Sequence, residues 1–229
     1  MIAASSTGFT AFERYLAYFL VFAFASGALA HYLPAVLPIT RVTTDGLLLV
    51  INGLLIYAVY RRNRGSGLFL WLLVAYWFTF AMEAIGVATG AVFGNYTYGP
   101  TMWWQWLGVP FVIALNWCVL TLACNELALR MLPPPAKGEG TLGRKVAVAA
   151  LAGGITAFYD VVIEPVAIQL DYWQWGGGEI PLQNYLAWAL IAFVISLPLH
   201  LFGVRFRSPV LLVYFFAQLF FFGVLNLAL

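Results

Sequence analysis

Apolar runs long enough to cross a bilayer recur along the entire chain of 229 residues. Helices are expected at seven of them: 12–33, 42–60, 68–89, 107–131, 146–170, 182–204 and 209–229. These lengths suit a hydrocarbon core about 30 Å thick, because a helix rises about 1.5 Å per residue. Apolar residues make up 63% of the chain and charged residues 9%, which leaves little material for a soluble domain. The sequence therefore predicts an all-α, polytopic membrane helix bundle that forms a single domain over residues 1–229.

Basic residues concentrate in every second connection between these runs. The second, fourth and sixth connections hold Arg61, Arg62, Arg64, Arg130, Lys137, Arg144, Lys145, Arg205 and Arg207, whereas the odd ones hold only Arg41. The positive-inside rule then places the amino terminus in the cytoplasm. The first apolar run has full spanning length, so we expect a retained anchor in the cell membrane, with the prokaryotic inner membrane as its site. The connection 133–140 has the composition of a flexible hinge.

Charge and ligand chemistry exclude several classes of protein. A net charge of +2 without a dense basic surface argues against nucleic acid as a partner. Cys118 and Cys124 lie in one apolar run, where they are expected to behave as small apolar residues. His31 and His200 are expected at different depths, and no spacing of ligands favours a metal, so we predict none.

Two carboxylic acids, Asp160 and Glu164, lie four residues apart inside an apolar run, so a helix places both on one face. Pro165 follows directly and is expected to free a backbone acceptor beside them. A third acid, Glu83, lies deep in the run 68–89. Ionisable side chains are costly in a bilayer and by default mark a functional site. These three acids are therefore the candidate reactive groups.

The remaining acids are predicted to have other roles. Glu126 precedes Arg130 by one helical turn near the end of its span, which favours an interfacial ion pair. Asp45, Asp171 and Glu179 fall at span ends or in loops and are expected to be solvated. Asn116 and Asn125 are candidates for interhelical hydrogen bonds, and Asn116 is also expected near the depth of Glu83.

Aromatic residues follow two of the acids at matching intervals. Tyr96 and Tyr98 come 13 and 15 residues after Glu83, and Trp173 and Trp175 come 13 and 15 residues after Asp160. This pattern suggests a weak internal repeat that relates the helix around 68–89 to the helix around 146–170. A second aromatic group, Trp103, Trp104 and Trp106, is typical of an interfacial belt. Three glycines at positions 86, 90 and 94 form a small-xxx-small series, which most simply permits close helix packing.

Acids and aromatic rings in an apolar cavity suit one kind of chemistry. Removal from water and a neighbouring carboxylate both favour a protonated carboxyl, which makes a strong proton donor. Its natural acceptor in a membrane is a trisubstituted alkene, which becomes a tertiary carbocation. Aromatic faces stabilise a cation without attacking it, and the remaining carboxylate can orient a water. These features predict a hydratase or a cyclase that acts on isoprenoid ends.

Specific motifs add a resemblance to this reading. The blocks are Glu83-Ala-Ile-Gly86-x-x-Thr89-Gly90-x-x-Phe93-Gly94-x-Tyr96-x-Tyr98, Gly108-Val-Pro110 before Asn116-Trp117, and Asp160-x-x-x-Glu164-Pro165-x-Ala167 before Trp173-x-Trp175. Together they resemble the CruF-type carotenoid 1,2-hydratase family. The resemblance implies a cofactor-free membrane enzyme that adds water across the terminal 1,2 double bond of an acyclic carotenoid such as lycopene or γ-carotene. It implies Glu83, Asp160 and Glu164 as the acids, with a substrate cavity lined by Phe93, Tyr96, Tyr98, Asn116, Trp173 and Trp175.

The expected mechanism has Asp160 or Glu164 protonating C2 of the ψ end, with Glu83 or the remaining acid positioning water at C1. A carotenoid cyclase that uses the same protonation stays open, as do a proton-coupled transporter and a non-catalytic carotenoid-binding protein. A retinal protein is disfavoured, because the last span contains no lysine. The expected partners are a carotenoid, the lipid bilayer and other enzymes of the carotenoid pathway.

Overall fold

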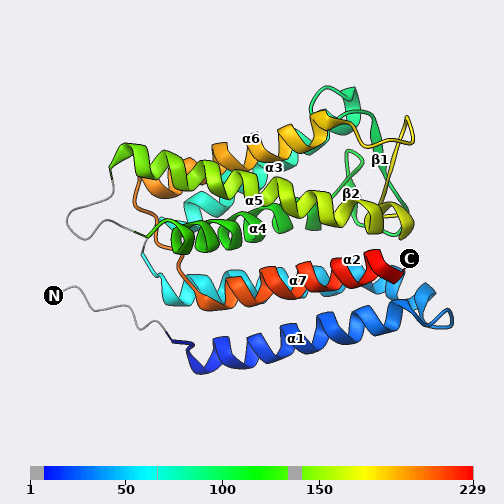
Figure 1. Cartoon of the computed structure of the whole chain (residues 1–229), viewed down its shortest axis with the longest axis horizontal. Helices are drawn as coiled ribbons and strands as arrows, with labels where there is room; N and C mark the ends of the chain where they lie inside the picture. Colours follow the sequence, from blue (N-terminus) through cyan, green and yellow to red (C-terminus); the bar gives the residue numbers. More distant parts are fainter. Residues whose placement is uncertain (1–7, 66, 134–140, 229) are drawn as a thin grey trace.

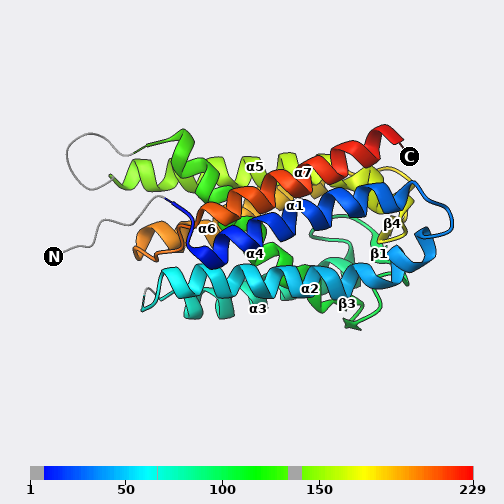
Figure 2. The same ribbon diagram turned by 90° about the horizontal axis from the view of Figure 1, so that it is seen from below.

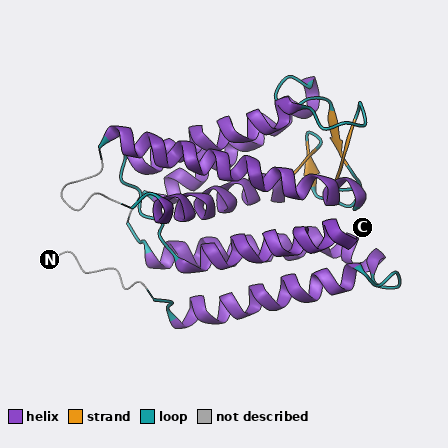
Figure 3. Ribbon diagram, in the orientation of Figure 1, coloured by secondary structure: helices purple, strands orange, loops and turns teal. Residues whose placement is uncertain are grey.

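Seven long helices, all running roughly along one axis, form the body of the protein (Figures 1 and 3). The computed structural model describes residues 8–65, 67–133 and 141–228. The helices are α1 (Ala11–His31), α2 (Leu37–Arg62), α3 (Leu68–Thr89), α4 (Phe111–Met131), α5 (Leu142–Gln169), α6 (Leu182–Leu201) and α7 (Pro209–Ala228). Each is long and apolar enough to span a membrane. The predicted all-α, polytopic bundle is confirmed, whereas most of the expected hinge at 133–140 lies outside the described residues.

Helix α4 is the centre of the bundle. Of its spanning residues 72% are buried, against 28–44% in the other six helices. It packs against α2, α3, α5, α6 and α7, while α5 lies along α6 and α1 lies along α7 (Figures 1 and 2). Side chains that α4 carries can therefore reach several neighbouring helices.

The start of α4 differs from the expected one. The run that was predicted as helical from residue 107 instead begins with a two-stranded hairpin, in which β2 (Gln105–Trp106) pairs with β3 (Val109–Pro110). Leu107 and Gly108 form the turn with positive φ angles of 53° and 74°, a conformation that a helix cannot use. Trp106 in the hairpin and Trp103 and Trp104 just before it are exposed, as expected of interfacial residues.

A second strand pair closes the same end of the bundle. Strand β1 (Tyr96–Tyr98), which follows α3, pairs antiparallel with β4 (Trp173–Trp175), which follows α5 (Figures 1 and 3). The register sets Tyr96 opposite Trp175 and Tyr98 opposite Trp173. Two aromatic pairs that are distant in the sequence therefore meet at one place.

Ion pairs fix the opposite end. Glu126 accepts hydrogen bonds from Arg130 at 3.1 Å and from Arg207 at 2.6 and 3.1 Å, which confirms the predicted pair and adds a second arginine. Glu13, at the start of α1, accepts from Arg62 at 2.7 Å and from Ser208 at 2.5 Å. These contacts join the ends of α1, α2 and α4 to the connection that leads into α7.

Further predictions concern one asparagine and three acids elsewhere in the chain. Asn125 donates to Ser196 at 2.7 Å and bonds His200 at 2.7 Å, so the predicted interhelical role of Asn125 is confirmed. The prediction that Asp45 is solvated is wrong, because the side chain is buried. Helix α2 begins at Leu37, five residues earlier than expected, so Asp45 lies two turns inside it, next to the backbone of Trp103 and Trp104. Asp171 is partly exposed and Glu179 exposed, as predicted.

Candidate active site

Glu83, one and a half turns before the end of α3, is buried among three hydrogen-bond donors. Its Oε2 accepts from the hydroxyls of Tyr96 and Tyr98, the latter at 2.8 Å, and its Oε1 accepts from the indole nitrogen of Trp117 at 2.8 Å. The two tyrosines were predicted beside this acid. Trp117 was not predicted as its partner: we had expected its neighbour Asn116 near Glu83.

A glycine on α3 makes room for these tyrosines. Gly86 lies one turn after Glu83, and a Cβ atom there would come within 2.7 Å of the Phe93 ring and 3.3 Å of the Tyr96 hydroxyl. Gly90 then ends the helix with a φ of 69° and lets the chain turn back. The glycine series was expected mainly to permit helix packing. Its first member instead permits the segment after α3 to fold back over the acid.

Asp160 and Glu164 lie on one face of α5, as predicted, and share one donor. The side-chain nitrogen of Asn184 on α6 bonds Asp160 Oδ2 and, at 3.1 Å, Glu164 Oε1. Glu164 Oε2 also accepts from the indole nitrogens of Trp173 at 3.0 Å and Trp175 at 2.9 Å. All three polar side chains are buried. Asn184 carried no recognisable signal in the sequence.

The intervals in the sequence had paired Trp173 and Trp175 with Asp160, but the structure pairs them with Glu164. The reason is the length of the two connections. Six residues separate α3 from β1, whereas three separate α5 from β4. The distance of an acid from the end of its helix therefore predicts its aromatic partners better than the interval in the sequence does. By that distance Glu164 corresponds to Glu83.

The two glutamates have parallel surroundings that differ in one respect. Each accepts two bonds on Oε2 from an aromatic-x-aromatic strand and one bond on Oε1 from the helix that follows. The partners of Glu83 include two hydroxyls, which can donate or accept a hydrogen bond. All three partners of Glu164 are N–H groups, and an indole N–H can only donate. Glu83 can thus change its protonation state and keep its partners, whereas Glu164 is best satisfied as a carboxylate.

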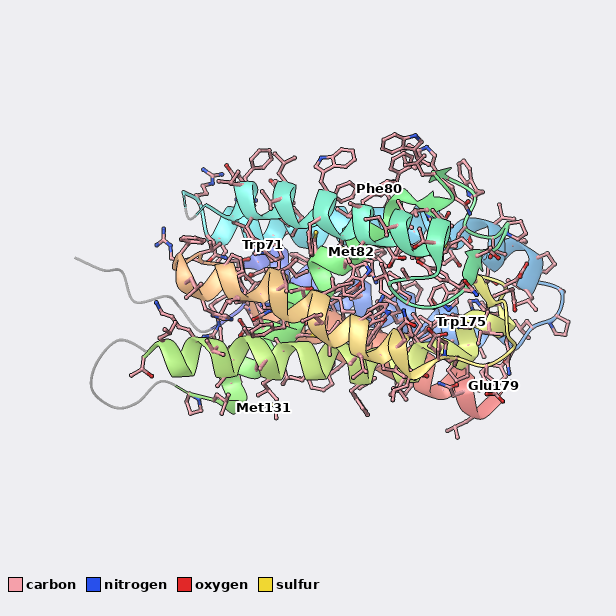
Figure 4. The ribbon with its side chains drawn as sticks, turned by 90° about the horizontal axis from the view of Figure 1, so that it is seen from above. Trp71, Phe80, Met82, Met131, Trp175 and Glu179 are labelled. Carbon is pink, nitrogen blue, oxygen red and sulfur yellow. The ribbon has the colours of Figure 1, made fainter. Side chains whose placement is uncertain are left out.

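A cavity of about 160 Å³ connects these groups. One water needs only about 10–15 Å³ of such volume, so the cavity has room for an organic end group together with water. Glu83 and Glu164 both line it, and so do all six predicted lining residues: Phe93, Tyr96, Tyr98, Asn116, Trp173 and Trp175. Trp175 lies at the end of the bundle that carries the strands (Figure 4). The predicted residues are therefore brought together around one space.

Further aromatic and amide groups complete the wall. The ring of Trp188 on α6 stacks on Trp117, with centroids 4.0 Å apart and planes inclined by 26°. Asn116 accepts a hydrogen bond from Tyr214, and Gln218 accepts one from Tyr159 at 2.6 Å. Both amides line the cavity. The wall is mainly aromatic with a few polar groups, which suits an apolar ligand that must be oriented.

Asp160 has a different position from the two glutamates. It is fully buried but does not line the cavity, and its Oδ1 has no hydrogen-bond partner among the described residues. A bare carboxylate oxygen in an apolar bundle is costly. A proton on Oδ1 removes that cost, so Asp160 is suited to store a proton one turn away from Glu164.

The charges around the site come from these acids themselves. Within the described residues, the three ion pairs involve Glu13 and Glu126, and none involves Glu83, Asp160 or Glu164. Burial and then the charge of Glu83 raise the pKa of Tyr98 well above its usual value, and the same causes raise that of Tyr96. Both hydroxyls thus keep their protons. The described part of the chain holds no cluster of three or more His, Cys, Asp or Glu residues that suits a metal ion.

A helical membrane bundle with buried acids around an aromatic cavity defines a polytopic membrane protein with a candidate acid–base site. The model of the carotenoid biosynthesis protein family matches residues 45–229, and the chain belongs to this family. The predicted resemblance is confirmed at that level.

One similar protein is named as a hydratase. The chain is 31% identical over 140 residues to a bisanhydrobacterioruberin hydratase of Haloarcula japonica. The match covers 59% of this chain and 45% of the relative, so the chain spans less than half the length of that protein. No solved structure has a significant match to the chain.

Proposed function

We propose that the protein is a carotenoid hydratase that adds water to the terminal 1,2 double bond of an acyclic carotenoid ψ end, as in lycopene or γ-carotene. The observation that carries this proposal is a pair of glutamates, Glu83 and Glu164, that face one aromatic cavity without a cationic partner among the described residues. Membership of the carotenoid biosynthesis family and the likeness to a hydratase support it.

The proposed reaction begins with proton transfer to C2. At rest the proton of the pair is on Asp160 and Glu164 is a carboxylate. The proton passes to Glu164, which lines the cavity, and from Glu164 to C2. The π electrons form the new C–H bond, and C1 becomes a tertiary cation. The rings of Trp173, Trp175 and Trp188 stabilise that charge and offer it no nucleophile comparable to water.

Capture of the cation by water completes the addition. The oxygen of a water bonds C1, and Glu83 removes a proton from that water, which leaves a tertiary hydroxyl. Glu83 can take this proton because the hydroxyls of Tyr96 and Tyr98 can turn to accept from it. The cycle closes when the proton that Glu83 took from water is transferred to the Asp160/Glu164 pair. Protonation and water capture require no cofactor.

The experiment that tests this function is expression in a host that accumulates lycopene, followed by chromatography and mass spectrometry of the pigments. The expected product is heavier than lycopene by one water. An isomer of unchanged mass with altered absorption would favour a cyclase. Unchanged lycopene, with the protein folded in the membrane, would contradict hydration of lycopene and favour another isoprenoid substrate, the transporter or the carotenoid-binding protein.

A further inference from the structure

The cavity reaches the surface of the bundle between α1 and α2. Among its lining residues Thr43 and Leu47 on α2 are exposed, Leu47 by 43%, while the others are buried or partly buried. Ala23 and Gly27 on α1 line the same side of the cavity. In Figure 2, α1 and α2 run beside each other, with β1 and β4 visible at the end where the two helices connect. These positions lie in helices that are long and apolar enough to span a membrane, so we expect the opening to face lipid.

The polar side chains at the opening are already bonded. The hydroxyls of three threonines donate to backbone carbonyls of their own helix: Thr40 to Leu37 at 2.9 Å, Thr43 to Ile39 at 2.9 Å and Thr44 to Thr40 at 2.7 Å. Such bonds satisfy the hydroxyls locally, which leaves mainly the methyl groups to contact a ligand. The opening therefore suits an apolar chain.

Small residues keep the opening wide on the α1 side. Ala23 and Gly27 lie one turn apart on one face of α1. A Cβ atom at Gly27 would already be 3.5 Å from the Phe221 ring of α7, which also lines the cavity. Phe24 and His31 of α1 also line the cavity, so the result is a slot with small side chains at positions 23 and 27 and aromatic rings around them, a shape that fits a flat conjugated chain.

We propose that this opening between α1 and α2 binds the polyene chain of the substrate. The inference rests on the proposed function, because it requires a ψ end at Glu83 and Glu164. A rigid polyene is about as long as the hydrocarbon core is thick, about 30 Å, so it cannot fit inside the cavity. With its end group at the acids, the remaining chain leaves between α1 and α2 and lies in the bilayer, and the substrate enters by the same route.

The test is a bulky residue in the opening. Leu47→Trp narrows it, whereas Val50→Trp adds the same ring one turn further along α2 at a position that is 53% exposed and does not line the cavity. We expect Leu47→Trp to lower the lycopene retained by the purified protein and the hydrate formed from it about tenfold or more, while Val50→Trp changes both less than about twofold. A short isoprenoid alkene with the same end group passes through the opening but leaves no chain in it, so Leu47→Trp should lower its hydration much less than that of lycopene.

Two readouts separate this proposal from the proposed function. Retained lycopene reports binding without turnover, so its loss in Leu47→Trp alone would support the opening even if no hydrate forms in the wild type. Equal retention by the two variants would overturn the proposal, as would a wild type that retains no lycopene. Equal loss of activity towards the long and the short substrate would overturn it as well.

Discussion

Tyr98 lies directly opposite Trp173 in the β1–β4 pair, with ring centroids 6.1 Å apart, yet the two side chains bond different acids. Tyr98 donates to Glu83 at 2.8 Å and Trp173 donates to Glu164 at 3.0 Å. The strand pair therefore fixes the positions of both glutamates relative to each other. A change on either strand is expected to affect both ends of the proposed reaction.

Removal of either donor should slow the reaction and leave the fold intact. A hydrogen bond to a charged group contributes about 1.5–3 kcal/mol, so Tyr98→Phe and Trp173→Phe should each lower kcat/KM about tenfold to hundredfold. The double variant should lose less than the product of the single losses, because the two rings are in contact. Trp103→Phe, at an exposed position outside the cavity, is the control. Activities of Tyr98→Phe and Trp173→Phe equal to that of the control would contradict this role.

Asn184 is expected to be as important as the acids it joins. Asn184→Leu leaves Asp160 Oδ2 and Glu164 Oε1 without their shared donor, and an unsatisfied buried polar group costs about 1–3 kcal/mol. We expect lower thermal stability and a loss of hydrate formation. Leu186→Ala, at an exposed position on the same helix that does not line the cavity, should retain activity. If Asn184→Leu hydrates lycopene as fast as the wild type, the shared donor is unnecessary.

Gly86 tests whether the segment that covers Glu83 must approach α3 closely. In Gly86→Ala the new methyl group would lie within 2.7 Å of the Phe93 ring, so overpacking of about 1–3 kcal/mol is expected, together with displacement of Tyr96. Gly53→Ala is a matched control, because a Cβ atom there meets nothing within 4 Å and alanine favours a helix. Thermal unfolding should separate the two variants. Equal melting temperatures would show that the close approach is not required.

Substitutions of Glu126 and Asp160 should have opposite effects. The first should lower stability and spare activity, and the second should abolish activity and spare the fold. Glu126→Gln weakens the contacts to Arg130 and Arg207, and the half-exposed arginines limit the expected loss of stability to about 1–3 kcal/mol. The folded fraction should keep its activity.

Asp160→Asn should abolish turnover without unfolding the bundle. Normal product formation by folded Asp160→Asn protein would remove Asp160 from the mechanism.

The seven helices could be predicted because bilayer thickness sets the length of an apolar run. The residues around the cavity could be predicted because an acid inside such a run is costly and so marks a site. The partners of the acids could not be predicted so well. Trp117 and Asn184 reach Glu83 and Glu164 from other helices, and which side chain reaches depends on how each helix is rotated. Equal intervals suggested Asp160 as the counterpart of Glu83, but the shorter connection after α5 makes Glu164 that counterpart. The cytoplasmic amino terminus, the cell membrane and the internal repeat stay predictions.

The most direct measurement uses isotopically labelled water. Wild-type protein acting on lycopene in deuterated water that carries heavy oxygen should give a product with one heavy oxygen at C1 and one deuterium at C2, and Asp160→Asn should give neither. That result would support protonation followed by capture of water. A hydroxyl oxygen derived from molecular oxygen, or a C2 without deuterium, would contradict the account.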